Sequence, residues 1–273
     1  MKKIYWYIIC DGKLFLPNGE LPCEEFCPVA PAEGMIVFGL GLIDGVPARA
    51  VCCQEKLTDL VGLRDAYELL PEKFYKPALV ALEKVLWDLN SQRCPVCGGR
   101  MDPAGFSSKR CCTCGKPQYT IIAPAAIILI KRKKSALLVR AKNFRGSFYG
   151  LVAGFVELGE SLEECVVREA YEETGLKLKN LKYFGSQIWP YPNSLMLGFT
   201  AEAINGDITL QDSELTDAQF FTIDNLPELP RKDSLARKLI DSWIAEQTTA
   251  SIPQSATPSF SDLEAFKSAA ILS

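Results

Sequence analysis

A glutamate-rich segment of 23 residues, covering 154–176, is the part of the sequence that most constrains the fold. It reads GFVELGESLEECVVREAYEETGL and holds seven glutamates. Ser161 is followed three residues later by Glu164, a capping-box pattern that predicts a helix beginning at Leu162. Gly175 is suited to the left-handed residue that ends such a helix. The segment therefore predicts a loop, then a helix, then a defined stop.

Three glutamates of this predicted helix fall on one face. Glu169, Glu172 and Glu173 are spaced i, i+3 and i+4, so at about 100° per residue their side chains lie close together. Each such like-charge pair costs an isolated helix about 0.2–0.5 kcal/mol, a cost that a bound cation reverses. Oxygen ligands on a rigid face suit Mg2+ or Mn2+, which also bind substrate phosphates. The competing interpretation is a solvated acidic helix face.

Two Cys-x-x-Cys pairs mark a short insert elsewhere in the chain. Cys94 and Cys97 form the first pair, and Cys111 and Cys114 form the second after thirteen intervening residues. This spacing is typical of four thiolates around a tetrahedral zinc ion. Four protein ligands make a closed site, which stabilises the fold and does no catalysis. Cys112 can replace Cys111 as a ligand, and buried cysteines without metal are the alternative.

A nucleic-acid-binding ribbon is a second interpretation of this insert. Such a ribbon would carry clustered basic and aromatic residues, and the insert offers Arg100, Lys109, Arg110 and Phe106. The net charge of −3 and the pI of about 5.3 give no footprint for duplex nucleic acid or for an anionic membrane. Nucleotides remain candidate partners.

The sequence contains no histidine. This excludes Ser-His-Asp and Cys-His nucleophile systems, histidine-ligated zinc hydrolysis and a histidine general base. Proton transfer must then fall to carboxylates, tyrosine, lysine or metal-bound water. The cysteines outside the insert lack disulfide-like spacing, which favours free thiols in a reducing cytoplasm. The apolar run near the N-terminus is too short to span a membrane and has no cleavage site, so no membrane association is expected.

The apolar pattern predicts an α+β protein with four parts. Residues 1–90 alternate strand-like stretches such as YWYIIC and ARAVCC with turns, then close with the helical pattern ALVALEKVLWDL. Residues 91–118 hold the cysteine insert. Residues 119–246 begin with a strand pair, YTIIAPAAIILIKR and SALLVRA, and end with a helix near 234–245, which predicts a second α/β domain. Residues 247–273 are rich in Ser, Thr, Ala and Pro and predict a flexible tail.

The glutamate segment resembles the box of the Nudix hydrolases, Gly-x5-Glu-x7-Arg-Glu-U-x-Glu-Glu-x-Gly-U, where U is apolar. Every fixed position matches: Gly154, Glu160, Arg168, Glu169, Glu172, Glu173 and Gly175, with Ala170 and Leu176 in the apolar slots. The resemblance implies an α/β/α sandwich whose loop and helix bind divalent metal. It also implies hydrolysis of a nucleoside diphosphate linked to another group.

A second segment resembles the NADH pyrophosphatase subfamily of Nudix hydrolases. SQIWPYPNSLM, residues 186–196, is similar to the subfamily pattern Ser-Gln-Pro-Trp-Pro-Phe-Pro-x-Ser, except that Ile188 stands in place of a proline and Tyr191 in place of a phenylalanine. That subfamily has an N-terminal domain, a four-cysteine zinc ribbon and then the catalytic domain. FLPNGELP, residues 15–22, resembles its N-terminal signature, so the likeness covers most of the chain and leaves out the tail.

The resemblance implies a catalytic set and a metal-binding set. Divalent metal would be held by the Ala153 carbonyl, Glu169, Glu173 and Glu214. Glu172 would share this ligation or position the attacking water, and Arg168 would hold the glutamates by bidentate hydrogen bonds. The catalytic set comprises Glu160, Arg168, Glu169, Glu172 and Glu173.

The resemblance also implies a substrate-binding set from several parts of the chain. Aromatic rings of this set can stack on adenine or nicotinamide, and the small Ala236 permits close approach of the backbone. Arg64 would contact the substrate from the N-terminal domain. The full set is Arg64, Tyr119, Phe155, Gln187, Ile188, Trp189, Pro190, Tyr191, Pro192, Asn193, Ser194 and Ala236.

These features predict hydrolysis of NADH or NAD+ at the diphosphate bond, giving AMP and the nicotinamide mononucleotide. Mg2+ or Mn2+ would be the catalytic cofactor, and a glutamate would act as base. The same chemistry extends to removal of NAD caps from RNA 5′ ends. ADP-ribose or a dinucleoside polyphosphate is the alternative substrate, and a nucleotide sensor whose zinc ribbon contacts nucleic acid is the alternative class. The resemblance further implies a homodimer.

Overall fold

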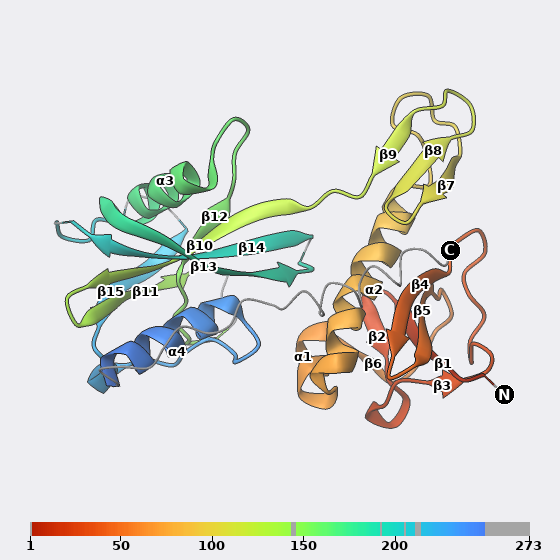
Figure 1. Cartoon of the computed structure of the whole chain (residues 1–273), viewed down its shortest axis with the longest axis horizontal. Helices are drawn as coiled ribbons and strands as arrows, with labels where there is room; N and C mark the ends of the chain where they lie inside the picture. The colour runs from red at the N-terminus through yellow and green to blue at the C-terminus, as the bar shows by residue number, and fades with distance from the viewer. Residues whose placement is uncertain (1, 143–145, 192, 205, 211–213, 249–273) are drawn as a thin grey trace. The chain divides into compact units, whose positions relative to one another are not determined.

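The computed structural model describes residues 2–142, 146–191, 193–204, 206–210 and 214–248 (Figure 1). The chain divides into two units, whose described residues fall within 2–121 and 122–248. The finer division into four parts remains a prediction. Nearly all of the predicted tail, from residue 249 on, lies outside the described residues.

A mixed sheet forms the centre of the second unit, in the order β13-β14-β10-β11-β15, with β12 paired to β10. β10 runs parallel to β14 and antiparallel to β11 and β12. The predicted strand pair is confirmed as β10 and β11. The strands are β10 (Ala123–Arg132), β11 (Ser135–Ala141), β12 (Val152–Phe155), β13 (Leu178–Trp189), β14 (Ser194–Ala203) and β15 (Leu215–Phe221).

Two helices cover this sheet, α3 (Leu162–Thr174) and α4 (Leu235–Thr248), on opposite faces (Figure 1). Successive residues of a strand point to opposite faces, so an apolar run such as β10 can serve two cores. Ile128 joins the core under α3, while Leu129 joins the core under α4 with the fully buried Trp243. The predicted α/β/α sandwich is confirmed.

The first unit contains a second mixed sheet and two helices. Its order is β4-β5-β1-β2-β6, with β3 paired to β1. The helix α2 packs against β1, β4 and β5. The strands are β1 (Ile4–Cys10), β2 (Lys13–Phe15), β3 (Cys23–Glu24), β4 (Phe38–Ile43), β5 (Val46–Cys52) and β6 (Leu60–Val61), and the helices are α1 (Leu63–Leu69) and α2 (Glu72–Asn90).

The cysteine insert follows α2 and forms a small antiparallel sheet of β7 (Met101–Gly105), β8 (Ser108–Cys111) and β9 (Pro117–Tyr119). A buried ion pair ties this ribbon to α2, between Lys109 of β8 and Asp88 of α2, whose side chains are 1% and 0% exposed. Lys109 Nζ also donates to the carbonyl of Ser91 at 3.2 Å. Asp88 Oδ2 accepts from the amide of Ile36 at 2.8 Å. The carboxylate therefore joins three segments of the first unit.

None of the helices in the described ranges is both long and apolar enough to cross a membrane. All eleven cysteines lie in those ranges and are free thiols.

Candidate active site

The loop and helix at the centre of the site follow directly from the local sequence. Gly154 of β12 pairs with Ala126 of β10, and the chain then turns into α3. Ser161 Oγ accepts from the amide of Glu164 at 3.2 Å, and Glu164 Oε2 accepts from the amide of Ser161 at 2.8 Å. Gly175 ends the helix in the left-handed region with φ 70°. The predicted capping box, helix start and helix stop are all confirmed.

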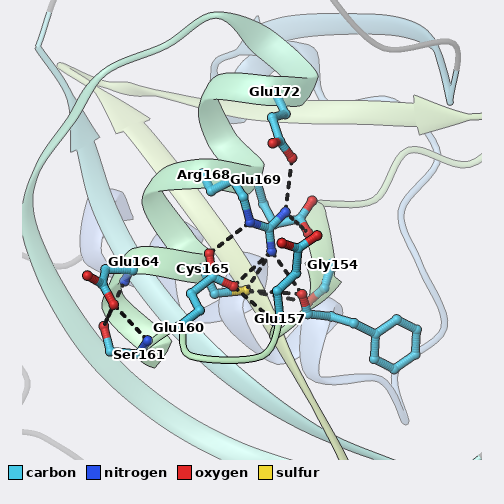
Figure 2. Close-up of polar contacts among 10 residues, drawn as sticks. Gly154, Glu157, Glu160, Ser161, Glu164, Cys165, Arg168, Glu169 and Glu172 are labelled. Carbon is cyan, nitrogen blue, oxygen red and sulfur yellow. Dashed lines mark hydrogen bonds and ion pairs between the residues drawn. The ribbon is translucent and has the colours of Figure 1, made fainter.

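Arg168 lies at the centre of a carboxylate cluster (Figure 2). Its Nε and Nη2 donate to the two oxygens of Glu160 at 2.8 and 3.0 Å, a bidentate pair. Its Nη1 donates to Glu169 Oε1 at 2.8 Å and to Glu172 Oε2 at 2.9 Å. Nη2 also donates to the carbonyl of Phe155 at 2.9 Å. One guanidinium therefore fixes three carboxylates relative to the end of β12.

The pKa values of two carboxylates in this cluster, Glu160 and Glu169, are shifted in opposite directions. The hydrogen bonds from Arg168 lower the pKa of Glu160 to about 2. The pKa of Glu169 is raised, first by burial and then by the charges of Glu172 and Glu214, against the opposing effect of Arg168. Additional positive charge near Glu169 would therefore stabilise its ionised form.

Glu169 also explains why residue 154 is glycine. A β-carbon at Gly154 would lie only 1.8 Å from Glu169 Oε1 and 1.9 Å from its carboxyl carbon. No side chain can occupy that space unless the carboxylate moves. The absence of a β-carbon therefore lets the glutamate lie directly against the β12 backbone.

The donors predicted to hold divalent metal all lie in the second unit. Ala153 and Glu169 come from β12 and α3, Glu173 is 5% exposed near the end of α3, and Glu214 directly precedes β15. The backbone carbonyl of Glu214 accepts from the amide of Lys142 at 2.8 Å, which fixes its position against the end of β11. Carboxylate and carbonyl oxygens are the ligands that Mg2+ and Mn2+ prefer. Two carboxylates of this set are electrostatically coupled, because the charge of Glu214 contributes to the raised pKa of Glu169. A donor set made of carboxylate and carbonyl oxygens fits a hard divalent cation.

The four predicted zinc ligands converge in the first unit. The Sγ atoms of Cys94, Cys97, Cys111 and Cys114 all lie within 4.8 Å of one another. Cys94 and Cys114 are 3.7 Å apart and Cys97 and Cys111 are 3.4 Å apart, close to the separation of about 3.8 Å that tetrahedral Zn–S bonds of 2.3 Å imply. Backbone hydrogen bonds, led by that from Cys114, lower the pKa of Cys111 to about 6.

Cys112, the alternative ligand, lies outside this group of four. It is exposed, and its Sγ is 3.8 Å from Thr113 Oγ1. Cys111 is 3% exposed, and its Sγ accepts from the amide of Thr113 at 3.4 Å. The geometry therefore selects Cys111 as the fourth member of the cluster.

The predicted substrate residues of β13 and β14 surround the turn between these strands. Trp189 and Tyr191 form an edge-to-face pair with ring centroids 5.7 Å apart. Gln187 Nε2 donates to the carbonyl of Asp233 at 2.6 Å. This bond joins β13 to the segment just before α4, the helix that contains Ala236. Ser194 is 3% exposed. The residues here are Gln187, Ile188, Trp189, Pro190, Tyr191, Asn193 and Ser194, while Pro192 lies outside the described residues.

The other predicted substrate residues are divided between the two units. Phe155 ends β12 beside the Arg168 cluster and is 52% exposed. Arg64 lies on α1 and Tyr119 on β9, both in the first unit and both exposed. The second unit therefore brings together the carboxylate cluster, Phe155 and the β13–β14 turn without these two residues.

Two backbone groups that shape the site were not predicted from the sequence. The amide of Glu157 donates to Glu160 Oε2 at 3.0 Å, and the carbonyl of Phe155 accepts from Arg168. The fixed spacing of five residues between Gly154 and Glu160 was the signal for both contacts, because a loop of set length places its backbone as well as its side chains.

Comparisons with known proteins found a matching family model and several similar proteins. A family model described as NUDIX domain matches residues 122–243. An NAD-capped RNA hydrolase NudC from Pseudomonas aeruginosa is 45% identical over 169 residues, which is 62% of this chain and 61% of the relative. Proteins of the same name from Deinococcus radiodurans and Escherichia fergusonii are 37% and 35% identical, covering 88% of this chain in both cases and 87% and 93% of the relatives. A NUDIX hydrolase crystal structure from Nitrosomonas europaea matches with a TM-score of 0.49 and 19% identity, over 57% of this chain and 92% of that chain.

Proposed function

This chain belongs to the NUDIX hydrolase family, within its NudC group, and from that premise we propose that it hydrolyses the diphosphate bond of NADH, NAD+ and NAD-capped RNA. The products from the free dinucleotides would be AMP and the nicotinamide mononucleotide. The activity for which these relatives are named, hydrolysis of NAD-capped RNA, supports the extension to capped RNA.

The observation that carries this proposal is the Arg168 cluster. Arg168 holds Glu160, Glu169 and Glu172 by hydrogen bonds of 2.8–3.0 Å. Such preorganised carboxylates need no rearrangement when a cation and a diphosphate arrive. A solvated acidic helix face would not concentrate its hydrogen bonds on one half-buried guanidinium.

Each carboxylate of the cluster receives a role in this proposal. Glu169, Glu173, Glu214 and the Ala153 carbonyl would hold Mg2+ or Mn2+, which when bound neutralises the diphosphate and activates water. Glu172 keeps a side chain 52% exposed, so it can reach a water molecule and accept its proton. Glu160 and Arg168 would act as positioning residues, because their bidentate pair sets the orientation of the guanidinium.

Aromatic side chains would bind the bases of the substrate. The exposed ring of Phe155 and the edge-to-face pair of Trp189 and Tyr191 offer flat apolar surfaces for adenine or nicotinamide. Arg64 and Tyr119, which lie in the first unit, remain predicted substrate contacts from the family resemblance. A homodimer and a cytoplasmic location remain predictions, the first from the family resemblance and the second from the free cysteines.

Zinc is proposed for the four-cysteine cluster, with a structural role. The cluster uses all four positions of a tetrahedral site, so it leaves no position for water or substrate. Zinc binding there would stabilise the ribbon, which has few apolar residues of its own.

The test is to incubate the purified protein with NADH, NAD+, ADP-ribose and NAD-capped RNA, each with Mg2+ or Mn2+, and to separate the products by chromatography. We expect AMP and the nicotinamide mononucleotide, abolished by a chelator. Glu173→Gln should lose about a hundredfold or more in turnover, whereas Glu163→Gln, an exposed glutamate of the same helix, should retain it.

Relative rates among the four compounds separate the proposed function from its alternatives. Faster hydrolysis of ADP-ribose than of NADH and capped RNA would assign the chain to the alternative substrate class. No hydrolysis of any compound by folded, zinc-loaded protein would support a nucleotide sensor instead.

A further inference from the structure

A basic hairpin turn lies at the end of the central sheet opposite the β13–β14 turn. Residues 131–134 read KRKK, and Arg132 of β10 pairs with Ser135 of β11, so Lys133 and Lys134 form the turn. These two lysines fall between the stretches YTIIAPAAIILIKR and SALLVRA of the predicted strand pair. The net charge of −3 hides this local excess of positive charge.

The turn does not favour lysine on conformational grounds. Lys133 has φ 54°, in the left-handed region, where asparagine and glycine are the preferred residues of two-residue hairpins. Lysine here therefore has an unfavourable backbone conformation. A role for its charge explains why a basic side chain occupies the position.

The turn borders a hollow of about 380 Å³ in the second unit. The hollow lies between the ends of β10, β13 and β14, and half of the residues around it are cationic. Its charged lining residues are Lys131, Arg132, Lys133, Lys179 and Glu202. We refer to these five residues together with Lys134 as the basic hollow.

Only part of this charge is compensated within the described residues. Lys131 Nζ lies 3.1 Å from Glu246 Oε2, and Lys179 Nζ lies 3.8 Å from Glu202 Oε2. Arg132 donates to the carbonyl of Gly206 at 2.6 Å and lies 4.0 Å from the centre of the Phe220 ring, contacts that hold it in place without neutralising it. Arg132 and the exposed Lys133 thus leave a surplus of positive charge.

We propose that the basic hollow binds the phosphates of the RNA leader downstream of the NAD cap, an inference that rests on the proposed function. Four lysines and an arginine complement a single-stranded phosphate backbone. Free NADH carries no phosphate beyond its diphosphate, so the hollow adds nothing to its binding. The hollow would therefore favour capped RNA over the free dinucleotide.

The distance between the two sites predicts which leaders can reach the hollow. Gly154 pairs with Ala126, and Lys133 lies seven residues further along the chain, or about 23 Å at 3.3 Å per residue. A stacked strand spans this distance with about seven nucleotides at 3.4 Å each. Leaders shorter than this should gain nothing from the hollow.

The test variant is the double substitution Lys133→Gly and Lys134→Asn. It removes two positive charges and places glycine at the turn position whose φ is 54°, so the hairpin should be at least as stable as before. We expect kcat/KM for NADH to stay unchanged and kcat/KM for NAD-capped RNA with a long leader to fall about fivefold or more at low salt. The slope of log kcat/KM against log salt should become shallower by about 1.4 for this RNA.

The matched control is Lys2→Asn with Lys3→Asn, which removes two exposed lysines from the first unit and changes the net charge equally. It should leave both substrates unaffected. An equal loss for capped RNA in this control would overturn the inference, because net charge alone would then account for the effect. So would a test variant that processes capped RNA at the wild-type rate.

Binding of uncapped single-stranded RNA separates failure of this inference from failure of the proposed function. Followed by fluorescence anisotropy, this binding should weaken in the test variant and not in the control, whether or not the wild type cleaves the cap. Normal cleavage with unaltered RNA binding would sink the inference alone. Wild-type protein that cleaves no dinucleotide would refute the proposed function, and the RNA-binding measurement would still test whether the basic hollow binds RNA.

Binding to anionic lipid vesicles tests the other source of phosphate groups. Altered binding to these vesicles in the test variant, with unaltered RNA binding, would assign the hollow to a membrane surface and also overturn the inference.

Discussion

The carboxylate of Glu169 lies against Gly154 so closely that a β-carbon on residue 154 would come within 1.8 Å of Glu169 Oε1. This contact joins the end of β12 to the acidic face of α3. It also places one carboxylate of the cluster beside the backbone of β12, just before the loop that leads into α3. The spacing between glycine and glutamate in the sequence is therefore a packing requirement.

Gly154→Ala should displace Glu169 and reduce kcat/KM by about a hundredfold, because a shift of about 1 Å in a catalytic group can have that effect. Steady-state kinetics with NADH would measure the loss. Gly185→Ala is the matched control, since a β-carbon on this strand residue meets no atom within 4 Å. Equal activity of the two variants would contradict the role of the contact.

Arg168→Lys should lower both activity and stability although it conserves charge. A lysine ammonium cannot reproduce the planar fork that binds Glu160 bidentately while reaching Glu169 and Glu172. We expect the free energy of unfolding to fall by about 1–2 kcal/mol, given that the side chain is partly exposed. Urea unfolding would measure this, with Arg100→Lys, at an exposed ion pair, expected to change it little. Wild-type activity in Arg168→Lys would show that charge alone suffices.

The pair formed by Glu160 and Arg168 should make stability depend on acid pH. Arg168 lowers the pKa of Glu160 from 4.5 to about 2, so the folded state binds fewer protons than the unfolded state between these values. The contribution of the pair is therefore complete above about pH 4.5 and is lost as the pH falls toward 2. The difference in unfolding free energy between wild type and Glu160→Gln should shrink over that range. A difference that stays constant would show that the carboxylate is not held by the arginine.

Cysteine substitutions should separate the zinc ligands from their neighbour. Cys97→Ser removes one of the four clustered thiols and should lower both zinc content and the thermal stability of the first unit. Cys112→Ser should retain one zinc per chain, because this exposed thiol lies outside the cluster. Metal analysis and thermal unfolding would measure both effects. Loss of zinc in Cys112→Ser would reverse the assignment of Cys111.

Local patterns predicted the catalytic helix well because its ends are encoded by neighbouring residues. Ser161 and Glu164 satisfy each other's backbone amides, and Gly175 takes the left-handed conformation that the helix stop requires. The spacing of the two cysteine pairs likewise placed four thiols together, since their positions depend on two short turns.

The helix α2 extends beyond the helical pattern found in the sequence. That pattern, ALVALEKVLWDL, begins at Ala78, immediately after Pro77, whereas the helix begins at Glu72. Proline usually interrupts a helix because it lacks an N–H group. Here Pro77 lies near the N-terminal end, where it removes one backbone hydrogen bond and the helix continues through it.

Contacts between residues far apart in sequence gave no local signal. Gln187 donates a hydrogen bond to the carbonyl of Asp233, 46 residues away. Lys179 and Lys133 line the same hollow because the sheet places the ends of β13, β14 and β10 side by side. No periodicity specifies such pairs, because strand order depends on the packing of the whole core. The basic hollow was therefore visible only once the strands were assembled.

The buried pair of Lys109 and Asp88 should be strongly coupled, since each side chain is at most 1% exposed and the pair joins the ribbon to α2. Lys109→Met leaves a buried carboxylate without its cation and should destabilise the first unit by about 3–5 kcal/mol. Adding Asp88→Asn should restore part of this loss, because the amide can still accept from Ile36 and carries no charge. Lys73→Met, at an exposed pair with Asp44, should cost at most about 1 kcal/mol. Urea unfolding of the wild type, the single variants Lys109→Met and Asp88→Asn, their double variant and Lys73→Met measures these effects, and strictly additive effects of the two buried substitutions would refute the coupling.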